Sequence, residues 1–102
     1  MTLGSGETRY YRLEVAARLV GLSPVHVRRY VASGLVRPAV RDERELLLSD
    51  AELARLRKIR RLRVDLGLNE PAIGIVLSLL DEVESLRREL ARYAAEVERG
   101  VR

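Results

Sequence analysis

Residues 13–38 read LEVAARLVGLSPVHVRRYVASGLVRP, and this stretch decides the fold. Its first third carries apolar side chains at helical spacing, which predicts a helix over residues 12–20 with one buried face. Gly21 follows and is typical of a helix C-terminus, where glycine adopts the left-handed conformation at little cost. The apolar face consists of Leu13, Ala16, Ala17 and Val20.

The next part of the stretch predicts a second helix over residues 24–32. Ser23 is a typical N-cap residue, and Pro24 suits the first helical position because its missing N–H has no partner to lose there. Gly34 ends this helix. Two short helices joined by a tight glycine turn form a helix-turn-helix.

Residues 35–48 contain a proline, a charge cluster and an apolar run, and we interpret them as a small β-hairpin or loop, a wing. Ser49 followed by Glu52 matches a capping box. A third helix then runs to about residue 66, where Gly67 stops it. Its apolar face is lined by Leu53, Leu56, Ile59, Leu62 and Leu66, and basic side chains fill its other faces.

A fourth helix is predicted over residues 70–97, with apolar residues at alternating spacings of three and four. Such spacing forms a heptad seam. A helix of about 28 residues is about 42 Å long, too long for a compact head to cover, so the seam favours a partner helix from a second copy. The alternatives are a helix that bends back onto its own head and a seam that binds another protein. The seam residues are Val76, Leu79, Val83, Leu86, Leu90, Tyr93 and Val97.

These elements predict an all-α fold class with a small β wing. Residues 1–9 form a disordered tail, residues 10–69 a winged helix-turn-helix head, residues 70–98 a dimerisation helix and residues 99–102 a short tail.

Charge is distributed unevenly along the chain. Residues 28–63 carry eleven basic and five acidic side chains, a net charge of +6, whereas residues 64–102 carry five basic and eight acidic ones, a net charge of −3. A basic head and an acidic tail indicate two surfaces with different partners. The alternative is an ordinary charged, solvated surface.

The composition argues against an enzyme. The chain has no cysteine and a single histidine, His26, and it contains no glycine-rich phosphate loop. Its one acidic cluster has no histidine or cysteine beside it, so we expect no metal site and no cofactor. The absence of cysteine and of a long apolar run favours a cytoplasmic protein without a membrane span.

Residues 10–66 resemble the winged helix-turn-helix of the MerR superfamily. The resemblance is carried by Leu22-Ser23-Pro24, then Arg28-Arg29-Tyr30, Gly34-Leu35 and Pro38, followed by SDAELARLRKIRRLRVDLGLN at residues 49–69. It implies a head of three or four helices, a wing, and dimerisation through the last helix.

Two groups within this superfamily are similar to the chain. MerR regulators of the HspR type bind operator DNA, whereas chaperone modulators of the CbpM type bind the J-domain of a DnaJ-type co-chaperone in the DnaK system. The modulators carry RDLGLN where this chain has VDLGLN at residues 64–69, and residues 71–90 are similar as well. HspR-type regulators share the Gly-Leu-Asn. The chain also resembles DafA-type DnaK–DnaJ assembly factors.

The second helix favours duplex DNA as the partner. It carries residue types that contact phosphates and base edges, and a strongly basic head suits a polyanion. The residues expected to bind on this side are His26, Arg28, Arg29, Tyr30 and Arg37.

The wing favours a protein partner instead. MerR regulators place Arg-x-Tyr before the serine that caps the third helix, whereas this chain has Leu46 and Leu48 there, close to Asp42, Glu43 and Glu45. Acidic groups repel phosphate, and an apolar edge among charges suits protein contact. Our first hypothesis is therefore a homodimeric adaptor for a DnaJ-type co-chaperone or DnaK, with Leu46 and Leu48 in the interface. The alternative is a DNA-binding transcriptional regulator.

Overall fold

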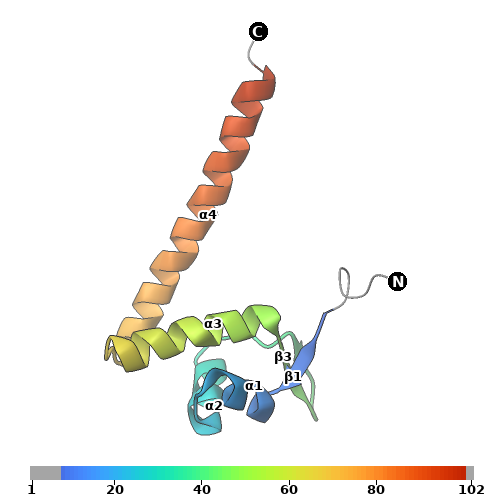
Figure 1. The fold of residues 1–102 in the computed structure, drawn as a ribbon. Coiled ribbons are helices and arrows are strands. Elements are labelled where there is room, and N and C mark those ends of the chain that lie inside the picture. Colours follow the sequence, from blue (N-terminus) through green and yellow to red (C-terminus); the bar gives the residue numbers. More distant parts are fainter. Residues whose placement is uncertain (1–7, 101–102) are drawn as a thin grey trace. The chain divides into compact units, whose positions relative to one another are not determined.

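The computed structural model describes residues 8–100, and the chain separates between Asn69 and Glu70 into two compact units. The second unit is the helix α4 (Glu70–Gly100). Figure 1 shows the elements in order along the chain. The mostly helical head with a small β wing is confirmed. The elements of the first unit are β1 (Tyr10–Arg12), α1 (Leu13–Val20), α2 (Pro24–Ala32), β2 (Val40–Arg41), β3 (Leu46–Ser49), α3 (Asp50–Arg60) and a π-helical turn, η1 (Arg61–Asp65).

The two predicted tails fall largely outside the described residues. Of the N-terminal tail, residues 1–7 lie outside them, and β1 begins at Tyr10. Of the C-terminal tail, residues 101–102 lie outside them, while residues 99 and 100 belong to α4.

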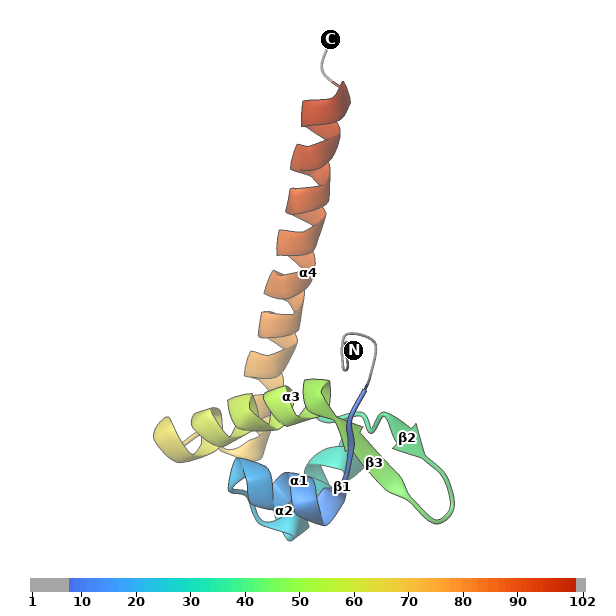
Figure 2. The same ribbon diagram turned by 45° about the vertical axis from the view of Figure 1, so that its right-hand side comes forward.

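α1 and α2 form the predicted helix-turn-helix and pack beside each other below α3 (Figures 1 and 2). All four apolar residues predicted for the inner face of α1 are buried. Gly21 ends the helix at φ 87°, and its N–H donates to the Ala17 carbonyl. A Cβ at Gly21 would lie 3.2 Å from Nε of Arg60, so glycine also permits the close approach of α3.

α2 begins and ends as predicted. The Oγ of Ser23 accepts a hydrogen bond from the Val25 N–H at 3.2 Å, and Pro24 occupies the first turn. Beyond the helix, Gly34 has φ 85°, which allows the chain to reverse so that the N–H groups of Leu35 and Val36 both donate to the Tyr30 carbonyl.

The three strands form one antiparallel sheet in the order β1-β3-β2. Figure 2 shows the β2–β3 hairpin, which confirms the predicted wing. β1 is not among the predicted elements, since the predicted first helix begins at residue 12. A three-residue strand carries no pattern of its own, and its partner is distant in sequence: Tyr11 pairs with Leu48, and its hydroxyl donates to Asp50 Oδ1 at 2.8 Å.

The capping box of α3 is confirmed. The backbone N–H and the hydroxyl of Ser49 both donate to Oε1 of Glu52, at 2.6 and 2.7 Å. Because the carboxylate accepts from the residue just before the helix, it fixes the point at which the sheet passes into the helix. Leu53, Leu56 and Ile59 on α3 are buried as predicted.

The predicted apolar face of the third helix is wrong at its C-terminal end. Leu62 is only half-buried and Leu66 is 66% exposed. The cause is η1, in which the Leu66 N–H donates to the Arg61 carbonyl five residues earlier. A π-helical turn holds more residues than an α-helical one, so side chains beyond it leave the face that a period of 3.6 assigns to them.

α4 is a single helix of 31 residues and ends three residues beyond the predicted boundary. At 1.5 Å per residue it is about 46 Å long. Ile73 and Leu77 near its N-terminus are buried.

The turn after α2 gives a test of the head. Gly34 has φ 85° with no atom within 4 Å of an added Cβ, so Gly34→Val introduces backbone strain without a clash. A β-branched residue in this region costs about 1–2 kcal/mol, and we expect the free energy of unfolding in urea to fall by that amount. Gly100→Val is the control, because Gly100 has open space and no positive φ. Equal free energies of unfolding for the two variants would contradict the left-handed conformation of Gly34.

Candidate nucleic-acid interface

The two faces of α2 differ sharply in chemistry. Val27, Tyr30 and Val31 are buried. The opposite face presents Val25, which is 62% exposed, together with exposed Arg28 and Arg29. No acidic residue occurs in this helix. The solvent face of α2 is therefore a short basic surface with one apolar contact point.

The direct contact role predicted for Tyr30 is wrong. Its side chain is only 1% exposed, and its hydroxyl accepts a hydrogen bond from Nη1 of Arg63 at 3.0 Å. Helical geometry explains this, since Tyr30 shares the inner face with Val27 and Val31. Tyr30 therefore anchors α2 to η1 and contributes nothing to the solvent face of the helix.

His26 lies at the border between the two faces of α2. It is half-buried, and its ring stacks on that of Tyr30 with centroids 6.4 Å apart and an interplanar angle of 20°. The stacking restricts the imidazole to the edge of the basic surface.

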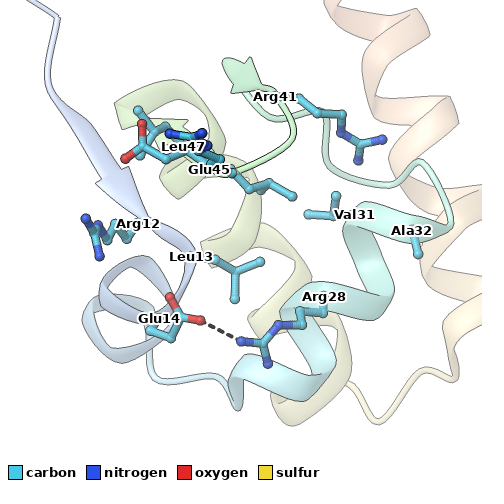
Figure 3. A pocket seen from close by; sticks show the side chains of 11 residues that line it. Arg12, Leu13, Glu14, Arg28, Val31, Ala32, Arg41, Glu45 and Leu47 are labelled. Atoms are coloured by element: carbon cyan, nitrogen blue, oxygen red, sulfur yellow. Dashed lines mark hydrogen bonds and ion pairs between the residues drawn. The ribbon is translucent and has the colours of Figure 1, made fainter.

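Arg28 is held by an acid from α1. Its Nη2 lies 2.5 Å from Oε2 of Glu14, and both side chains remain about half exposed. Figure 3 shows this ion pair beside the wing. The pair orients the guanidinium and partly neutralises it, so Glu14 sets how strongly Arg28 attracts an anion.

The tip of the wing is ordered by Asp42. Its Oδ1 accepts hydrogen bonds from the backbone N–H groups of Glu45 at 2.6 Å and Arg44 at 2.8 Å. These two hydrogen bonds lower the pKa of Asp42 below its usual 3.8, and the bond from the Glu45 N–H has the larger effect. Arg41 and Arg44 flank this turn with exposed side chains, and Arg37 is exposed before β2.

The predicted contact role of Leu48 is also wrong, because its side chain is 0% exposed. In the strand β3 successive side chains point to opposite faces, and Leu48 belongs to the core. Leu46 remains half-buried, as does Leu47 between them. The apolar edge expected at the wing is therefore made by Leu46 and Leu47.

α1, α2 and the wing enclose a groove of about 540 Å³, which we call the wing groove (Figure 3). Its lining combines apolar side chains with six charged ones. The apolar members are Leu13, Val31, Ala32, Leu46 and Leu47, and the charged ones are Arg12, Glu14, Arg28, Arg41, Arg44 and Glu45.

Part of the basic charge on α3 and η1 has a structural role. Nε of Arg55 donates to the Leu35 carbonyl at 2.5 Å, and Arg63 donates to Tyr30. These bonds tie α3 and η1 to α2 and the loop after it. Arg57, Lys58 and Arg61 are exposed.

The predicted seam on α4 is almost entirely uncovered. Val76 is half-buried, and the six residues after it in the heptad pattern are exposed, up to 68% for Leu90 and Tyr93. A monomer therefore leaves a long apolar stripe in water, which is unfavourable.

The described side chains contain no group of three histidines, cysteines or acids arranged to hold a metal ion. None of the described helices is long and apolar enough to cross a membrane.

Sequence reasoning missed several residues of this surface. Val25 occupies the same helical face as Arg28 and Arg29, and its spacing was a usable signal. Glu14 and Arg12 come from α1 and β1, and only the folded arrangement brings them to the groove. Arg41 and Arg44 contribute to the predicted basic charge of residues 28–63, but only the folded hairpin places them at the groove.

Comparisons with known proteins agree with this geometry. The profile of the family described as MerR HTH family regulatory protein matches residues 11–94. The chain is 34% identical over 89 residues to a protein of Streptomyces coelicolor (strain ATCC BAA-471 / A3(2) / M145) named "Putative heat shock protein HspR". The match covers 87% of this chain and 59% of that relative's length.

Asp42 gives a test of the wing turn by pH. Because its folded pKa is lowered, its carboxylate contribution is complete above about pH 3.8 and is lost as the pH falls through the lower folded value. We expect the NMR amide shifts of Arg44 and Glu45 to titrate below pH 3.8. Asp42→Asn, whose amide oxygen accepts the same bonds without ionising, should remove this titration. Amide shifts that titrate above pH 3.8 would refute the turn.

Proposed function

This chain belongs to the MerR family of helix-turn-helix regulatory proteins, and we propose that it binds duplex DNA as a homodimer. α2 would enter the major groove, the wing would contact the backbone, and α4 would join the two copies. The observation that carries the proposal is the solvent face of α2, which is basic and free of acids.

The chemistry of this face suits a base-reading helix. Arginine reads guanine with two hydrogen bonds or contacts a phosphate, and an exposed aliphatic side chain such as Val25 can contact a thymine methyl group. Arg28 and Arg29 are adjacent, so they diverge by about 100° around the helix and reach different parts of the groove. His26 at the border is suited to a phosphate.

The wing supplies further cations for the backbone. Arg41 and Arg44 flank the turn ordered by Asp42, and Arg37 is exposed nearby. Arginine contacts to phosphates position a protein on the duplex without reading sequence. The +6 charge of residues 28–63 supports this part of the proposal.

Dimerisation is supported by the exposed seam of α4. A helix of 31 residues with six exposed seam positions has enough length for a coiled coil with a second copy. A symmetric dimer carries two copies of α2, so we expect a pseudo-palindromic operator with two half-sites. The relative's name contains "heat shock protein", and we propose a heat-shock operator as the target.

A second candidate is an adaptor that binds a DnaJ-type co-chaperone or DnaK. It is favoured by one observation, the half-buried Leu46 and Leu47 that line the wing groove. Phosphate groups make no apolar contacts with leucine side chains, whereas a protein partner can bury them. The adaptor hypothesis places Leu48 in the interface, and its burial in the core removes that part of the argument.

The first test removes the basic surface of α2. We expect Arg28→Ala with Arg29→Ala to weaken binding of a 30-base-pair duplex, selected from a random pool by the wild type, about 100-fold, since each contact contributes about 1–3 kcal/mol. Glu14→Gln is the control with the opposite expected effect, because it removes the ion pair that partly neutralises Arg28. It should strengthen binding several-fold and change stability little, as expected of an exposed pair. Fluorescence anisotropy over a salt series measures both.

The same titrations separate the two candidates. Wild-type affinity for DNA should fall steeply with salt, because neutralised phosphates release counterions. The DNA proposal is wrong if the double variant binds like the wild type. Binding only in the nonspecific range of about 10⁻⁴–10⁻⁶ M, together with salt-resistant binding of a purified DnaJ-type J-domain, would favour the adaptor.

The second test concerns the seam. Leu86→Glu would bury a charge between two α4 helices, at a cost of several kcal/mol, and light scattering should then report a monomer. Ser85→Glu adds the same charge at the adjacent exposed position outside the seam and should leave the dimer intact. A wild type that is monomeric at about 100 µM would show that α4 packs in another way.

A further inference from the structure

We propose that the wing groove docks a short peptide segment of a partner protein, in which large apolar side chains are flanked by carboxylates. The groove is defined by the described residues of α1, α2 and the wing, and it needs no second copy of the chain. Its volume of about 540 Å³ lies in the range of pockets that enclose small ligands.

The apolar part of the groove selects the apolar part of the ligand. Leu46 and Leu47 of β3 are half-buried and line the groove, and the buried side chains of Leu13 and Val31 complete its apolar lining. Figure 3 shows Leu13 and Val31 directed toward the middle of the groove. An aliphatic or aromatic side chain seated there removes apolar surface of both partners from water.

The charged part selects carboxylates. The structure gives no hydrogen bond or ion pair to the side chains of Arg12, Arg41 or Arg44 among the described residues, whereas Arg28 is engaged by Glu14. Glu45 is the one acid of the lining outside that pair, so the groove has an excess of cations. Carboxylates on either side of an apolar side chain would meet these arginines.

A DNA backbone could pair with the charged part of this lining but not with its apolar part. Phosphates would pair with the arginines, but they leave Leu46 and Leu47 without an apolar partner and approach Glu45. An acidic-apolar peptide matches both parts, which is why we assign the groove to a peptide. Because Arg28, Arg41 and Arg44 belong to both surfaces, peptide and duplex should compete, and this consequence alone rests on the proposed function.

Direct binding to the full chain tests the groove. The probe is a fluorescein-labelled hexapeptide with two central leucines flanked on each side by an aspartate and a glutamate, followed by anisotropy. We expect saturable binding by the wild type. Replacing the leucines of the probe by serine, or its acids by lysine, should each weaken binding at least tenfold.

Variants of the protein locate the site. Arg41→Ala with Arg44→Ala should weaken probe binding roughly tenfold, as expected for two exposed ion pairs, and Leu46→Ser should do so by a similar factor. Arg92→Ala with Arg99→Ala removes the same charge from exposed positions on α4 and should have no effect. A thermal melt accompanies Leu46→Ser, and the arginine variants test the groove without touching the core.

Four results would overturn the proposal. The serine probe binding like the leucine probe would reduce the groove to a general anion site. Equal weakening by the groove and α4 arginine variants would show nonspecific charge attraction. No saturable binding by the wild type would remove the site. A change of oligomeric mass in the groove variants with unchanged probe binding would assign the groove to a second copy.

The competition experiment is read separately. Displacement of the probe by the selected duplex supports overlap of the two surfaces. If the chain binds no duplex but still binds the probe with the expected variant pattern, the proposed DNA function fails and the groove stands.

Discussion

The burial of Tyr30 is the constraint on which the arrangement of the head depends. Its side chain is buried on the inner face of α2, its hydroxyl accepts a hydrogen bond from Arg63 of η1, and its carbonyl accepts hydrogen bonds from the N–H groups of Leu35 and Val36 beyond the turn. One residue thus joins a helix, the loop after it and the segment that follows α3. A buried polar group favours the packing that supplies its hydrogen-bond partner, because losing that partner leaves the group unpaired.

With the inner face of α2 fixed in this way, its outer face is determined. Val25, Arg28 and Arg29 lie on the solvent face of the helix. Glu14 of α1 forms an ion pair with Arg28. The ion pair therefore orients one of the two exposed arginines of α2, Arg28. The Arg28–Glu14 pair also lowers the attraction for any anion in exchange for orientation, which favours selective over nonspecific binding.

Local patterns in the sequence predicted the parts of the fold that depend on neighbouring residues. The inner face of α1, the Ser23 cap, the Ser49–Glu52 box and the wing are all local. Three features were not predictable in this way. β1 exists only because β3 lies beside it, η1 interrupts a helical period that looks continuous, and Tyr30 and Leu48 resemble contact residues in type although packing buries them. The candidate site was predicted on α2, while the wing groove needed the folded arrangement of α1 and the wing.

The uneven charge of the chain gives its two proposed surfaces opposite responses to salt. Residues 70–100 carry seven acids and four bases, so two α4 helices brought together repel one another, and added salt screens that repulsion. The basic head behaves in the reverse way, since salt weakens every contact with a polyanion. Assembly through the apolar seam is therefore compatible with conditions that release DNA. In the proposed dimer, salt would weaken DNA binding at the head without weakening the apolar seam, so the two copies of α2 would stay together.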